Sequence, residues 1–102
     1  MAAARSRHVV VDGIRTHYLE GGDGPTVVLL HSGEFGGCAE LTWEPTIPAL
    51  VERYRVVAPD WLGFGGTDKL HDFNGGQARR LWHMGRVLEA LALDDAVLVG
   101  SS

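Results

Sequence analysis

The chain has 102 residues, which bounds it to one domain, and its 13 acidic and 9 basic side chains leave a formal net charge of −4. This charge argues against non-specific nucleic-acid binding, which needs clustered Lys and Arg. The lone Cys38 cannot form an internal disulfide, and no Cys/His cluster has zinc-ligand spacing, so we expect neither a disulfide nor a metal to stabilise the fold. Without a run of roughly 20 apolar residues, the composition favours a cytoplasmic protein that does not enter a membrane.

An antiparallel hairpin is predicted near the start of the chain. The extended runs His8 to Val11 and Ile14 to Leu19 are joined by Asp12 and Gly13, and an Asp-Gly loop is the strongest short-range hairpin signal. After a glycine-rich break, Thr26 to Leu30 is an uninterrupted apolar run, typical of a strand buried on both faces of a parallel sheet. This run is therefore expected to be an interior strand.

Helices and strands then alternate along the chain. We expect a short helix from about Trp43 to Arg53, a buried strand from Arg55 to Ala58, the longest helix from Asn74 to Leu91, and a third buried strand from Ala96 to Val99. The apolar face predicted for the longest helix comprises Ala78, Leu81, Trp82, Leu88, Leu91 and Ala92. The resulting order β-β-β-α-β-α-β predicts an α/β fold with a mostly parallel sheet covered by helices.

Three glycine-rich segments follow the three parallel strands. They lie at the carboxyl ends of the strands, where ligand-binding and catalytic residues are found in such folds. They are His31 to Gly37, Asp60 to Asp68 and Gly100 to Ser102. Gly100, Ser101 and Ser102 fit the first half of the nucleophile elbow G-x-S-x-G, whose sharp turn requires small flanking residues. Taken alone these three residues also fit an ordinary polar strand end.

The loop after the first parallel strand strengthens the catalytic interpretation. Such a glycine loop donates a backbone N–H to an oxyanion, together with the residue after the nucleophile. His31 is expected to pack and to hydrogen-bond its own loop rather than to transfer protons. Asp60 is expected to anchor the loop at its strand end, and Asp68 to serve as a cap or turn residue. Trp61 and Phe64 are expected to pack this loop.

Together these segments resemble the N-terminal half of the α/β-hydrolase family. The matching stretches are Val28 to Gly37, Thr46 to Leu50, Tyr54 to Asp60, Gly63 to Asp68 and Val97 to Ser102. Within the family, Trp43 to Leu50 and Leu62 to Asp68 look most like the meta-cleavage product hydrolases. Those enzymes need no cofactor and hydrolyse a carbon–carbon bond in vinylogous diketones from aromatic-ring degradation.

The resemblance implies site roles for individual residues. Ser102 is the implied nucleophile, and the backbone N–H of Glu34 is one implied oxyanion donor. Further pocket or loop candidates are His31, Gly33, Phe35, Thr42 and Ser101. The chain departs from that subfamily at Ser32, where Gly is usual, at Glu34 and Phe35, where Gly-Pro is usual, and at Thr42 and Ser101, where Asn is usual. A carboxylate at Glu34 opposes an oxyanion unless its side chain turns away.

In this fold the acid and the His of a triad follow the nucleophile, so both are expected after residue 102. Residues 1–102 are then the N-terminal half of one core domain, without the lid and the C-terminal half. Ala96 to Val99 presents an uncovered apolar strand edge, so the remaining polypeptide or a second chain is the expected partner besides a small-molecule substrate. The sequence does not decide whether the chain also forms a homo-oligomer.

Three alternatives remain beside carbon–carbon bond hydrolysis. The first is an ester or lactone hydrolase of the same fold. The second is a non-catalytic fragment that keeps the fold without the chemistry. The third is a phosphate-binding βα module that uses Gly33 to Gly37, although the chain lacks both G-x-G-x-x-G and a P-loop lysine.

Overall fold

The computed structural model describes residues 4–31, 38–62, 64–67, 76–93 and 96–100. Within these residues one mixed sheet has the strand order β1-β2-β4-β3-β5. Its strands are β1 (Arg5–Val11), β2 (Ile14–Gly21), β3 (Thr26–Leu30), β4 (Arg55–Pro59) and β5 (Val97–Gly100). The pairs β1–β2 and β2–β4 are antiparallel, whereas β3 pairs in parallel with both β4 and β5. The predicted α/β class, a hairpin followed by parallel strands, is confirmed.

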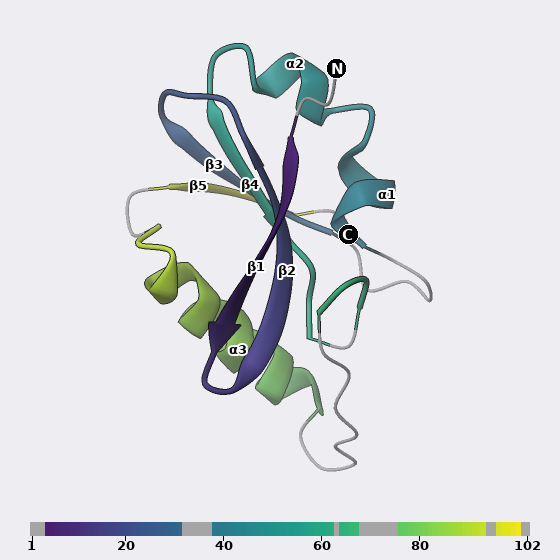
Figure 1. Ribbon diagram of the computed structural model, residues 1–102, viewed down its shortest axis with the longest axis vertical. Coiled ribbons are helices and arrows are strands. Elements are labelled where there is room, and N and C mark those ends of the chain that lie inside the picture. Colours follow the sequence, from purple (N-terminus) through teal and green to yellow (C-terminus); the bar gives the residue numbers. More distant parts are fainter. Residues whose placement is uncertain (1–3, 32–37, 63, 68–75, 94–95, 101–102) are drawn as a thin grey trace.

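Helices cover both faces of the sheet (Figure 1). Helices α1 (Ala39–Trp43) and α2 (Ile47–Leu50) lie on one face, and α3 (Gly76–Ala90) lies on the other. None of the helices in the described part of the chain is long and apolar enough to cross a membrane. The three layers place the carboxyl ends of β3 and β4 beside α1 and the loop after β4.

The hairpin turn forms as predicted from its two residues. Asp12 and Gly13 both have positive φ, 51° and 79°, as a two-residue turn of type I′ requires. The Asp12 carboxylate accepts hydrogen bonds of 2.9 and 3.2 Å from the Arg86 guanidinium on α3. These hydrogen bonds lower the pKa of the Asp12 carboxyl and raise that of Arg86. The turn is therefore attached to the helix that packs under it.

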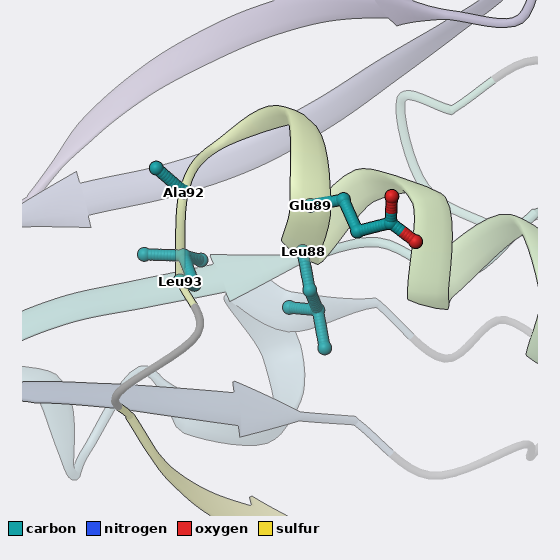
Figure 2. Close-up of a pocket in the computed structure, with 4 residues that line it drawn as sticks. All are labelled: Leu88, Glu89, Ala92 and Leu93. Carbon is teal, nitrogen blue, oxygen red and sulfur yellow. The ribbon is translucent and has the colours of Figure 1, made fainter.

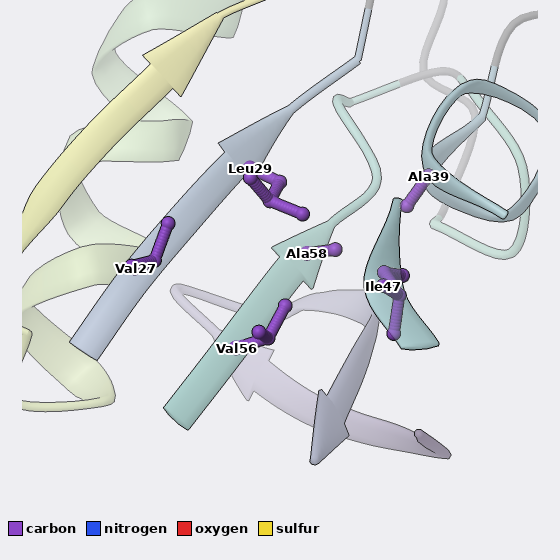
Figure 3. Packing of buried hydrophobic residues seen from close by; sticks show 6 residues of the cluster. All are labelled: Val27, Leu29, Ala39, Ile47, Val56 and Ala58. Atoms are coloured by element: carbon purple, nitrogen blue, oxygen red, sulfur yellow. The ribbon is translucent and has the colours of Figure 1, made fainter. Parts of the chain in front are cut away.

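The hydrophobic core follows the two-residue period of the strands. On the face under α1 and α2, the strands bury alternate side chains against the two helices (Figure 3), a cluster made of Val27, Leu29, Val56, Ala58, Ala39 and Ile47. The intervening residues Val28 and Val57 are fully buried on the opposite face, in a cluster with Tyr18 and Leu93. Both faces of β3 and β4 are thus apolar, as an interior strand requires.

The helix expected from Trp43 to Arg53 is wrong in its bounds, because the chain forms the two short helices α1 and α2 instead. Pro45 separates them. It has no N–H to continue the α1 hydrogen-bond ladder, and the N–H of Thr46 turns back to the Trp43 carbonyl at 2.9 Å. Pro48 falls in the first turn of α2, where its missing N–H costs nothing.

The buried face predicted for α3 is also wrong in part. Leu81 and Trp82 are 62% and 55% exposed, whereas His83, Met84 and Val87 are buried. His83 can be buried because its Nε2 shares a 2.9 Å hydrogen bond with Thr16 Oγ1 on β2. Together with the Arg86 pair to the hairpin, this contact sets the rotation of α3 about its axis. The side chain of Ala78 and the start of the predicted helix at Asn74 lie outside the described residues.

The C-terminus of α3 ends in a Schellman motif, which also accounts for Ala92 being exposed rather than buried. Ala92 has φ 57°, the N–H of Leu93 donates to the Leu88 carbonyl, and the N–H of Ala92 donates to the Glu89 carbonyl. Figure 2 shows these four residues, which line an open depression at the helix end. The depression lies away from the carboxyl ends of the strands.

Candidate active site

The parallel register brings two predicted site segments to one edge. Leu30 at the end of β3 pairs with Gly100 at the end of β5. His31 follows Leu30 directly, and Ser101 and Ser102 follow Gly100 along the chain. The predicted positions Ser101, Ser102, Gly33, Glu34 and Phe35 lie outside the described residues, so their roles stay predictions.

His31 has a packing role, as predicted. It is 3% exposed, and its Nε2 accepts the backbone N–H of Trp61 at 3.0 Å. The Trp61 indole N–H donates to the His31 carbonyl, also at 3.0 Å, and the Phe64 ring meets the imidazole edge-on. Among the described residues the partner is the loop after β4, because β3 and β4 are neighbours. The expected hydrogen bond to the histidine's own loop involves residues outside the described ranges and stays a prediction. Trp61 and Phe64 pack this loop, as expected.

Asp60 anchors three segments at once, which confirms its predicted structural role. Its carboxylate is almost fully buried, and Oδ1 accepts the N–H of Ala39 at 2.7 Å. Oδ2 accepts the N–H of Gly66 at 3.0 Å and shares a 2.6 Å contact with His17 Nδ1. The carboxylate therefore connects the start of α1, the loop after β4, and strand β2. We call Asp60, His17 and the Gly65–Thr67 turn the Asp60 junction.

Close packing completes the Asp60 junction. The Thr67 hydroxyl donates to the Asp60 carbonyl at 3.0 Å and accepts the His17 N–H at 3.1 Å. Gly65 has φ 51°, and a Cβ there would overlap the Asp60 carboxylate. A Cβ on Gly66 would lie 2.9 Å from the His17 Cβ. Gly65 is therefore favoured by its positive φ and by the Asp60 carboxylate beside it, and Gly66 by the close approach of the loop to β2. Asp68 lies outside the described residues.

The sequence analysis missed His17, although its side chain belongs to this junction. The pairing of Tyr18 with Pro59 places His17 beside Asp60, 43 residues along the chain. Only the β2–β4 register produces this contact, and no local motif signals it. Thr42, the other predicted pocket residue that is described, lies in α1 and is half-buried.

Electrostatically this edge holds a buried carboxylate with hydrogen bonds to both oxygens. Those hydrogen bonds come from backbone N–H groups and His17, so the contacts of Asp60 are structural. Within the described ranges no cluster of three or more His, Cys, Asp or Glu could hold a metal ion. We call these contacts the rim: hydrogen bonds that connect the end of β3 to the loop after β4, and that loop to α1 and β2.

The model of the α/β hydrolase fold family matches residues 25–102, and the chain belongs to this family. It is 42% identical over 97 residues to a 2-hydroxy-6-oxo-6-(2'-aminophenyl)hexa-2,4-dienoic acid hydrolase of Metapseudomonas resinovorans, covering 94% of this chain and 33% of that relative.

Two solved structures are similar. A serine hydrolase involved in carbazole degradation superposes with a TM-score of 0.89 at 40% identity, over 98% of this chain and 39% of that one. A meta-cleavage product hydrolase from Pseudomonas fluorescens IP01 does so with a TM-score of 0.85 at 35% identity, over 94% and 35%. The resemblance to meta-cleavage product hydrolases is confirmed. The chain spans about a third of the length of the relatives it matches.

Proposed function

We propose that this chain is the front part of a serine hydrolase that cleaves a carbon–carbon bond in a vinylogous diketone from aromatic-ring degradation. The similarity to hydrolases of 2-hydroxy-6-oxo dienoic acids supports this substrate class. A single structural observation carries the catalytic part of the proposal, the pairing of Leu30 with Gly100. Leu30 and Gly100 end neighbouring strands, and Glu34 and Ser102 follow them in the sequence, which supports one site shared by both segments.

In the proposed mechanism, Ser102 Oγ attacks the substrate ketone while a histidine beyond residue 102 accepts its proton. The N–H groups of Glu34 and of the residue after Ser102 stabilise the oxyanion. The C–C bond breaks as its electron pair moves through the conjugated double bond onto the oxygen of the second ketone. That oxygen takes the proton from the histidine, which gives the enol form of the shortened dienoate. Water then hydrolyses the acyl-enzyme, so that the products are a carboxylic acid and a shortened dienoate.

The hydrogen bonds of the rim support this mechanism. His31 is held by Trp61 immediately before the proposed oxyanion segment, and Asp60 holds the N–H of Ala39 shortly after it. Both ends of that segment are therefore tied to the loop after β4. Fixing a hydrogen-bond donor before the reaction is what makes an oxyanion hole effective, since no reorganisation is needed in the transition state.

Replacing the proposed nucleophile is the decisive experiment. In the complete polypeptide, Ser102→Ala should lower kcat by several orders of magnitude, because triad members act as a unit. The loss of the conjugated dienone absorbance measures turnover, and circular dichroism checks the fold. Ser6→Ala, at an exposed position on β1, is the matched control and should retain most activity. Wild-type turnover by Ser102→Ala would refute the assignment.

The oxyanion donor is tested separately at Glu34. Because its backbone donates, Glu34→Gly should preserve or raise kcat, whereas Glu34→Pro removes the N–H and should lower kcat about 100-fold or more. Steady-state turnover of both variants in the complete polypeptide gives the comparison. Equal activity of the two variants would place the donor elsewhere.

An ester or lactone hydrolase is the second candidate, favoured by Glu34 and Phe35, which stand where Gly-Pro is usual in the carbon–carbon hydrolases. The ratio of kcat/KM for a dienoate ketone to that for an aryl ester distinguishes the two. A ratio well below one would assign the ester activity, with Ser102 in the same role.

We also propose that further polypeptide covers β5. Its side chains Val97, Leu98 and Val99 are 64%, 54% and 38% exposed, and among the described residues β5 pairs only with β3. Apolar strand edges of this kind are covered in native proteins. The same polypeptide would supply the triad acid and the histidine.

A further inference from the structure

A hydroxyl, an imidazole and a carboxylate contact one another in series across three segments of the sheet. The Ser6 Oγ on β1 lies 2.5 Å from His17 Nε2 on β2, and His17 Nδ1 lies 2.6 Å from Oδ2 of Asp60, the residue after β4. A nucleophile within hydrogen-bond reach of a base, which a third group orients in turn, is the geometric signature of an activated nucleophile. We call Ser6, His17 and Asp60 the Ser6 site.

The Asp60 carboxylate sets the direction of these hydrogen bonds. An ionised carboxylate only accepts, so the proton of His17 sits on Nδ1 and its lone pair on Nε2, where the Ser6 hydroxyl donates. Asp60 is itself held by the N–H groups of Ala39 and Gly66, at 2.7 and 3.0 Å. The acid of a Ser-His-Asp triad acts in the same way, because it fixes the tautomer and the orientation of the histidine.

Burial in the Ser6 site decreases from the acid to the hydroxyl. The Asp60 side chain is 2% exposed and that of His17 is 14% exposed, whereas Ser6 is an exposed residue. The His17 ring also packs against the ring of His8, its direct partner across the hairpin, with the centroids 5.1 Å apart. The acid and the base are therefore held in place, while the hydroxyl is open to reagents in solution.

The Ser6 site is separate from the edge of the sheet at which Ser102 is proposed to act. In the described sheet β1 and β5 are the two edge strands, with β2, β4 and β3 between them. Neighbouring strands lie about 4.8 Å apart, so four spacings separate β1 from β5 by about 19 Å. Ser6 therefore takes no part in the reaction proposed for Ser102, and the Ser6 site does not rest on the proposed function.

We propose that Ser6 is a second reactive serine, which accepts the acyl group of aryl esters, with His17 as its general base and Asp60 as a positioning residue. Ser6 Oγ forms a bond to the acyl carbon while His17 Nε2 takes the hydroxyl proton. The bond between the acyl carbon and the aryl oxygen then breaks, and the leaving phenol takes the proton from His17. An ester on an exposed serine hydrolyses slowly in neutral water, so the acyl group should stay on Ser6.

Acylation is tested with 4-nitrophenyl acetate on the complete polypeptide carrying Ser102→Ala, so that the proposed nucleophile does not react. Peptide mass spectrometry locates the acetyl group and follows its rate of appearance. We expect acetylation of Ser6 at least about tenfold faster in the folded protein than in the guanidinium-unfolded chain. Thr16, whose hydroxyl also contacts an imidazole, that of His83 at 2.9 Å, is buried and should stay unmodified. An unmodified Ser6, or equal rates in the folded and unfolded chains, would overturn the proposal.

Variants in the same Ser102→Ala background separate the roles of the base and the acid. His17→Asn keeps an amide N–H for Asp60 but removes the base, and should slow acetylation of Ser6 about 100-fold or more. Asp60→Asn should move the His17 proton to Nε2, which the imidazole ¹⁵N resonances report, and slow acetylation at least about tenfold. Asp12→Asn, which alters a carboxylate paired with Arg86 instead, is the matched control and should leave the rate unchanged. Unchanged acetylation in His17→Asn would refute the proposal.

Discussion

The Asp60 junction is buried, whereas the outer surface, by which we mean the exposed apolar side chains of α3 and β5, faces solvent. In the junction a carboxylate that is 1% exposed accepts hydrogen bonds from the start of α1, from the loop after β4 and from β2. On the outer surface, Leu81, Trp82 and Leu98 are each more than half exposed. Large exposed apolar patches mark interaction surfaces or aggregation sites. The rim of the candidate site is therefore built from within this chain, whereas the exposure of the outer surface is consistent with our proposal that further polypeptide covers it.

The largest expected effect concerns residues 1–102 expressed alone. The uncovered β5 edge should make this chain aggregate or fold poorly, and it should hydrolyse no ester. Size-exclusion chromatography and thermal denaturation measure this. Trp82→Lys combined with Leu98→Lys should reduce the aggregation, since both side chains lie on the exposed surface. A soluble wild-type monomer with a sharp cooperative melt would contradict this view of the outer surface.

Next in size is the loss of the Asp60 carboxylate. Asp60→Ala leaves the N–H groups of Ala39 and Gly66 and the ring of His17 without an acceptor, and should cost about 3–5 kcal/mol of unfolding free energy. Urea denaturation of the complete polypeptide provides the measurement. The matched control is Glu20→Ala, which removes the partly exposed pairs with Arg7 and Arg55 and should cost about 1 kcal/mol or less. Similar losses of unfolding free energy in the two variants would show that the buried Asp60 carboxylate stabilises the fold no more than a partly exposed ion pair does.

The smallest expected effect compares two glycines. Gly65 has positive φ and approaches the Asp60 carboxylate, so Gly65→Ala should lower the unfolding free energy by about 1–3 kcal/mol. Gly85 lies inside α3 with open space where a Cβ would go, so Gly85→Ala should raise it by about 0.5–1 kcal/mol. Denaturation midpoints of both variants would test this. A stabilising Gly65→Ala substitution would contradict the close packing of the junction.

Several elements of the fold could be predicted because their signals are local. The Asp12-Gly13 turn specified the hairpin, and the apolar runs of β3 and β4 specified interior strands of a parallel sheet. The α3 face could not be predicted from apolar residues alone. A polar residue, His83, occupies its buried side, and a hydrogen bond to Thr16 that spans 67 residues makes this possible.

The residues of the candidate site also differ in whether the sequence could predict their roles. The packing of His31 and the anchoring by Asp60 were predictable, since both residues stand directly at the ends of buried strands. The part played by His17 was not, because it depends on the register between β2 and β4. The roles of Glu34 and Ser102 still rest on the sequence pattern and the family.

The sequence by itself thus determined the α/β class and the hairpin, because turn chemistry and strand burial depend on neighbouring residues. It also predicted the edge of the sheet at which the candidate site lies. Only the tertiary structure decided which face of α3 is buried, what Asp60 holds, and that His8 meets His17. These contacts join residues distant in the chain. Strand register and helix rotation set them through packing and hydrogen bonds, which no local pattern encodes.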